Sequence, residues 1–176
     1  MVPDLVTSGL PLPPIALDPV AAIVFLPFAA LIGLYVAWSD LRGMRIPNGS
    51  VVLLALVYVL LGPLVLPLDV YGGRLVHLVV MLIAGMVLTA LRVMGAGDAK
   101  FIAAAAPFVA MADLMLVMVL FTATLVAAFV THRAARRTAL RRLAPDWESW
   151  SRTKEFPMGT ALTITLTIYL ALAALD

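Results

Sequence analysis

The chain has 176 residues, of which 64% are hydrophobic and 12% charged, and its mean hydropathy is +1.09. Soluble domains have about 45–50% apolar and about 25% charged residues, so this composition excludes a soluble fold and indicates a membrane protein. There are 0 cysteines and 2 histidines, which excludes disulfides and cysteine-ligated zinc and argues against a histidine-rich metal site.

Apolar runs predict the membrane helices in chain order. A proline-rich start, Met1–Pro19, carries no Lys or Arg and is interpreted as a short exported tail rather than a secretory signal. The fourth run has 33 residues, which as one helix would measure about 50 Å against a hydrocarbon core of about 30 Å. We therefore expect it to turn near Ala112–Asp113, with Asp113 as a turn residue, so that six spans result. The runs are Val20–Trp38, Val51–Leu68, Leu75–Leu91, Ala99–Thr131 and Pro157–Leu175.

The basic residues support this division. With six spans, the loops after the first, third and fifth lie on one side, and Arg74 is the only one of the 12 basic residues on the other side. With five spans the 12 would divide four against eight. Because basic loops stay in the cytoplasm, the sequence predicts an all-α protein with six transmembrane helices. We expect one membrane-embedded domain over residues 1–176, with both termini outside the cytoplasm.

The largest basic loop, His132–Phe156, combines a basic helical stretch with Trp147 and Trp150. Such a segment is expected to lie on the membrane surface and to contact anionic lipids; contact with a substrate is the alternative. The positive charge thus indicates topology and lipid contact, not nucleic-acid binding.

Two aspartates stand at the ends of predicted spans. Asp40 follows the first run, and Asp98 precedes the fourth. An ionised group costs roughly 2.5–3.5 kcal/mol at the bilayer centre and less toward its ends, so each requires a reason. Either one alone is explained by a helix dipole or by a neighbouring arginine. In the six-span topology both emerge at the cytoplasmic face, so we expect that they can meet.

A pair of carboxylates beside a glycine turn is suited to aspartyl proteolysis. Gly95 and Gly97 precede Asp98 and lack the Cβ that restricts backbone conformation and close approach. One carboxylate, ionised, takes a proton from water, while its protonated partner hydrogen-bonds the scissile carbonyl and later protonates the leaving amine. Such a pair shares one proton, because two like charges a few ångströms apart do not both ionise easily. This chemistry requires neither a cofactor nor a metal.

At these residues the chain resembles the type IV prepilin peptidases, a family of intramembrane aspartyl proteases with a Gly-x-Gly-Asp motif. The family pattern joins an aspartate at the end of a span to a basic stretch and Ile-Pro-Asn, here Asp40 through Asn48, and later shows Gly-x-Gly-Asp-x-Lys, here Gly95 through Lys100. The last span opens with Phe156-Pro157-Met158-Gly159, similar to a Pro-aromatic-Gly element of the family except at Met158. We assign no function to this element. The resemblance extends from the first span to the last.

The resemblance implies an enzyme that removes the basic leader of prepilins at the cytoplasmic face of the bacterial inner membrane. It implies Asp40 and Asp98 as the catalytic pair, and Gly95, Gly97 and Lys100 at the substrate. For Lys100, tuning of the pair, binding of a lipid phosphate and a purely topological role stay open. The pilin's apolar helix is expected to enter the membrane beside the fourth span.

Because the chain has no cysteine, it lacks the paired Cys-x-x-Cys motifs of the methylating relatives. It is similar to the short branch that processes Flp (tight adherence) pilins, so we expect peptidase activity without methyl transfer. Pseudopilins are a further possible substrate class.

A small proton- or cation-coupled transporter is the alternative, because two carboxylates and a glycine-broken helix also suit cation binding. Against it, both aspartates are expected at one face rather than near the midplane, and the chain shows no convincing internal repeat.

Overall fold

The computed structural model describes residues 14–152 and 155–176, and within them it is all-helical. Residues 1–13, which make up most of the predicted exported tail, lie outside the described residues. Short 3₁₀ helices, η1 (Ala106–Phe108), η2 (Met111–Asp113), η3 (Ala139–Leu143) and η4 (Glu148–Trp150), lie between the longer helices. The α-helices are α1 (Pro19–Gly43), α2 (Asn48–Val65), α3 (Leu68–Ala90), α4 (Ala96–Ala105), α5 (Leu114–Arg136) and α6 (Met158–Ala173).

Four helical segments are long and apolar enough to cross a membrane, namely α1, α2, α3 and the run η2–α5. This confirms a helical membrane protein. By contrast, α4 has 10 residues and α6 has 16, which correspond to about 15 Å and about 24 Å of helix. The number of membrane crossings therefore stays a prediction.

The long fourth run is divided near Ala112–Asp113, as predicted, since the segment between α4 and α5 ends at Asp113. Helix α4 ends at Ala105, the tighter η1 follows, and Val109 is extended. Pro107 lies inside η1, and because proline lacks the backbone N–H that an α-helix needs, it favours a break there.

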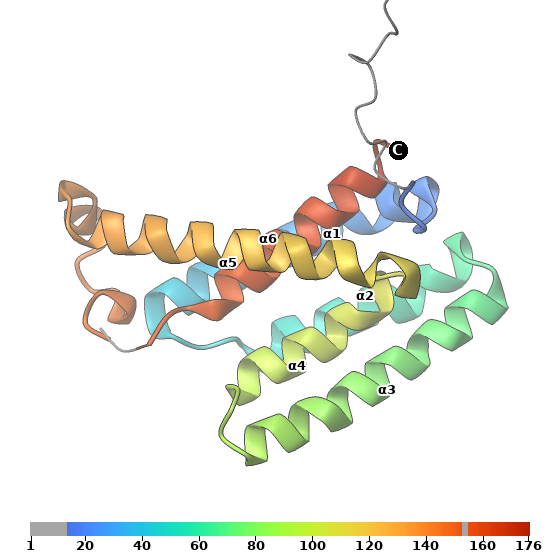
Figure 1. The fold of residues 1–176 in the computed structure, drawn as a ribbon, viewed down its shortest axis with the longest axis horizontal. Coiled ribbons are helices and arrows are strands. Elements are labelled where there is room, and N and C mark those ends of the chain that lie inside the picture. Colours follow the sequence, from blue (N-terminus) through green and yellow to red (C-terminus); the bar gives the residue numbers. More distant parts are fainter. Residues whose placement is uncertain (1–13, 153–154) are drawn as a thin grey trace, which may run out of the picture.

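Successive α-helices run in opposite directions (Figure 1). The ends of α1, α3 and α5 and the starts of α2, α4 and α6 therefore gather at one end of the molecule, on the left in Figure 1. We call this the basic end, because the last turns of α1 and α5 carry Arg42, Arg133 and Arg136, and Arg92 follows the end of α3. Asp40 near the end of α1 and Asp98 near the start of α4 are thus brought to the same end.

Core contacts hold α4 at both of its ends. After its C-terminal end, the rings of Phe25, Tyr58 and Phe108 pack with centroids 5.0–5.7 Å apart, which joins α1, α2 and η1. Near its start, α3 approaches α4 so closely that a Cβ at Gly85 would lie 2.9 Å from the Cβ of Ala99. Glycine at position 85 is therefore required for this packing, and the residue next to Ala99 is Asp98.

At the opposite end of the molecule, Asp113 is more than the predicted turn residue. It is only 6% exposed, and its carboxylate accepts hydrogen bonds from the backbone N–H groups of Ala16 and Leu17 and from the hydroxyl of Tyr169, at 2.7–3.2 Å. It thereby ties the chain before α1 to η2 and α6.

Replacement of Asp113 by alanine is expected to destabilise the fold. Each buried donor left without an acceptor costs about 1–3 kcal/mol, so the thermal unfolding midpoint in detergent should fall clearly. Asp69→Ala is the control, since Asp69 is an exposed carboxylate in the first turn of α3. Equal midpoints for the two variants would show that the Asp113 contacts contribute no net stability.

Candidate active site

Asp40 lies in the last turn of α1 and is 5% exposed. The helix ends at Met44, which adopts the left-handed conformation, with φ of 51°, and donates its N–H to the Asp40 carbonyl at 2.8 Å. This end cap satisfies the backbone of Asp40. Its side chain is less well satisfied, because Oδ2 is buried with no hydrogen-bond partner among residues 14–152 and 155–176. A buried, incompletely paired carboxylate is costly for stability and is therefore a candidate functional group.

Asp98 is the third residue of α4, and Gly95 precedes the helix in an extended conformation. The Asp98 side chain folds back toward this glycine, since a Cβ at Gly95 would lie 2.8 Å from Asp98 Oδ2. Burial raises the pKa of Asp98 above its ordinary value, whereas its place at a helix N-terminus favours a negative charge. Asp98 is thus suited to exchange a proton.

Both carboxylates line one pocket of about 580 Å³ at the basic end. They are close enough for the charge of Asp98 to act on Asp40, and the backbone N–H groups of Gly159 and Thr160 also approach Asp40. Like charges so placed favour a state in which the pair holds one proton. Three segments supply the rest of the lining, around Met44–Ile46, Val93–Gly97 and Glu155–Met158.

Gly95 and Gly97 contribute to the site because they lack a side chain, and not because they adopt unusual backbone angles. Gly95 has φ of −67°, and no described glycine has a positive φ. The space at Gly95 is taken by the Asp98 carboxylate, and the space at Gly97 by Ile46, whose Cβ would be 3.3 Å from an added Cβ. Their roles at the substrate stay a prediction.

Lys100 is exposed and does not belong to the pocket lining. Its Nζ donates a hydrogen bond to Asn48 Oδ1 at 3.0 Å, which links α4 to the first residue of α2. This contact joins the two sequence motifs at Asp40–Asn48 and Gly95–Lys100. A role for Lys100 at the substrate stays a prediction.

Gly159 belongs to the site, although sequence reasoning assigned no function to its element. A Cβ at Gly159 would lie 2.8 Å from Asp40 Oδ2 and 2.9 Å from Ile46 Cδ1. Helix α6 therefore approaches the catalytic candidates through a residue with no side chain. The signal that could have indicated this was the resemblance of Phe156-Pro157-Met158-Gly159 to the family's Pro-aromatic-Gly element.

Side chains that could ligate a metal ion do not cluster in the part of the chain that the structure describes. No three histidine or acidic side chains there lie close enough together to hold one ion.

The fold and the site define a helical membrane protein with two carboxylates in a pocket at one end of its helices. The sequence pattern of the type IV leader peptidase family matches residues 27–131, a segment that contains both Asp40 and Asp98 and more than half of the chain. No curated protein and no solved structure matches the chain. The chain belongs to the type IV leader peptidase family. It is therefore a membrane-embedded peptidase with prepilins as substrates, and the transporter alternative is left without support.

Proposed function

We propose that this protein is an aspartyl endopeptidase that removes the leader of Flp-type prepilins, with Asp40 and Asp98 as its catalytic pair in a single peptidase domain. The observation that carries the proposal is that the two carboxylates line one pocket, and that the charge of one acts on the other. Two carboxyl groups that share a proton supply both the base and the acid that peptide hydrolysis needs.

In the proposed reaction, the ionised carboxylate removes a proton from water as the water oxygen attacks the scissile carbonyl carbon. The protonated partner hydrogen-bonds the carbonyl oxygen, which carries the negative charge of the tetrahedral intermediate. As the intermediate collapses, the C–N bond breaks and this partner transfers its proton to the departing amine. The pair then again holds one proton, now on the carboxyl that activated the water, so the cycle closes without an external reagent.

We place this reaction at the cytoplasmic face of the bacterial inner membrane. The pocket lies at the basic end, and basic residues are retained in the cytoplasm. Arg45 lines the pocket, and the Arg42 guanidinium lies 5.1 Å from the ring centre of Trp38, an arrangement common at a membrane surface. The exposed Arg141 and Arg142 in η3 are proposed to contact anionic lipids.

The proposal predicts cleavage of a Flp-type prepilin when both proteins are produced in a heterologous bacterial membrane. We expect the pilin to migrate faster on a gel by the mass of its leader, and cells with the prepilin alone provide the control. Intact prepilin with several Flp-type substrates, at normal levels of the peptidase, would contradict the proposed substrate class.

A further inference from the structure

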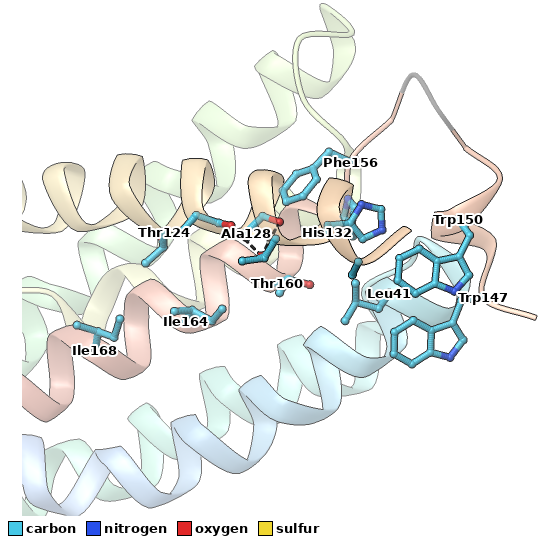
Figure 2. Close-up of a pocket in the computed structure, with 14 residues that line it drawn as sticks. Leu41, Thr124, Ala128, His132, Trp147, Trp150, Phe156, Thr160, Ile164 and Ile168 are labelled. Atoms are coloured by element: carbon cyan, nitrogen blue, oxygen red, sulfur yellow. Dashed lines mark hydrogen bonds between the residues drawn. The ribbon is translucent and has the colours of Figure 1, made fainter. Parts of the chain in front are cut away.

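A second cavity, an open groove of about 530 Å³, runs along α5 and α6 (Figure 2). Helix α6 contributes Ile164 and Ile168, and Trp147 and Trp150 lie at the end of the groove near Leu41. Its lining is mainly apolar. Of its three threonines, Thr124 shares its hydroxyl with Thr165 at 2.6 Å and Thr131 donates to the backbone of α5, whereas the Thr160 hydroxyl is buried without a partner among the described residues.

Apart from His132, the residues of α5 that line the groove are small and lie on one face of the helix. They recur at intervals of three or four positions, which is the spacing of one helical face. Small residues allow the backbone of another helix to approach closely, whereas the packing of a lipid chain does not require small residues. The residues are Thr124, Ala127, Ala128, Thr131 and Ala135.

The groove adjoins the pocket of the proposed catalytic pair. Phe156 lines both cavities. Leu41 in the groove directly follows Asp40 in the pocket. Thr160 lines the groove while its backbone N–H approaches Asp40. A chain that leaves the carboxylates on this side therefore comes next to the groove.

The end of the groove near the pocket is bounded by stacked aromatic rings. His132 and Trp150 stack with centroids 5.0 Å apart and an interplanar angle of 11°, and Trp147 stacks on Trp150 at 5.7 Å. From there the groove follows α6 from Thr160 to Ile168. Eight residues of helix rise about 12 Å, so about two turns of a neighbouring helix fit alongside.

We propose that this groove seats the apolar helical segment of the substrate that adjoins the cleaved bond. The proposal rests on the proposed function, because it takes the pocket of Asp40 and Asp98 as the place of cleavage. A substrate segment within the hydrocarbon region has to be helical, since only a helix satisfies its own backbone hydrogen bonds there. The groove lies on α5 and α6, whereas the sequence led us to expect the substrate helix beside the fourth span, where the structure has α4.

Site-specific crosslinking tests this placement, because the chain has no cysteine of its own. In an Asp98→Asn background, which is expected to keep the substrate uncleaved, Ile168→Cys is paired with a prepilin that carries one cysteine about two helical turns after the scissile bond. The matched control is Val119→Cys, an exposed aliphatic position on α5 outside the groove. Each cysteine variant is also made with Asp98 intact, to measure cleavage.

We expect a disulfide-linked peptidase–prepilin product from Ile168→Cys and only background from Val119→Cys. Equal yields from the two positions, or no product from Ile168→Cys although that variant cleaves the prepilin when Asp98 is intact, would overturn the groove proposal. A lipid chain would then be its occupant, and the proposed function would stand. If the unmodified peptidase does not cleave the prepilin, the proposed function fails and the groove proposal fails with it.

Discussion

Asp40→Asn and Asp98→Asn should each reduce prepilin cleavage by about 10²–10⁴-fold, the contribution of one general acid or base. Asparagine has nearly the shape of aspartate, so the pocket should keep its form, but an amide neither takes a proton from water nor delivers one to the leaving amine. The measurement is the initial rate of the gel shift of the prepilin in membranes with matched amounts of peptidase. Asp146→Asn is the control, since Asp146 is an exposed carboxylate that does not line the pocket.

The double variant distinguishes between two carboxylates that act as one unit and two carboxylates with independent roles. Groups that act together show strongly non-additive losses, so Asp40→Asn with Asp98→Asn should be about as inactive as either single variant. Processing at the normal rate by either single variant would remove that residue from the proposed pair. Losses that multiply would indicate two separate roles rather than one shared proton.

Hydropathy and charge were sufficient to predict the helical membrane fold and the gathering of Asp40 and Asp98 at one end. These signals are local, because the length of an apolar run and the charge of a loop do not depend on distant contacts. In the break of the fourth run, Pro107 interrupts the backbone hydrogen bonds near its start, and Asp113, which interrupts the hydropathy, stands at its end. Asp113 itself accepts a hydrogen bond from Ala16, 97 positions away in the chain, and no local sequence pattern predicts such a contact.

The site was predicted only in part for the same reason. Gly95 and Gly97 stand beside Asp98 in the sequence, so they were noticed. Gly159 is 119 positions from Asp40, and its importance comes from a contact between α1 and α6 that exists only in the folded chain. The groove on α5 and α6 likewise depends on how two helices pack, since their individual sequences resemble ordinary apolar spans.

Gly159→Ala is expected to lower prepilin cleavage by about 10–100-fold, because a displacement of about 1 Å in a catalytic group has a cost of this order. The added Cβ would lie 2.8 Å from Asp40 Oδ2 and 2.9 Å from Ile46 Cδ1, both closer than a methyl group normally approaches. The Asp40 carboxylate therefore has to move within the pocket.

The effect of Gly159→Ala on stability should be small, because the atoms that it crowds are the tips of side chains and not backbone. Gly49→Ala is the matched control, since Gly49 lies in the first turn of α2 and an added Cβ there meets no atom within 4 Å. Cleavage rates and thermal unfolding midpoints of both variants are compared with those of the unmodified peptidase. A lower midpoint that accounts for the lost activity would indicate that Gly159 serves packing alone. Normal cleavage would show that the Asp40 carboxylate does not need its observed position, which would weaken its assignment as one of the catalytic pair.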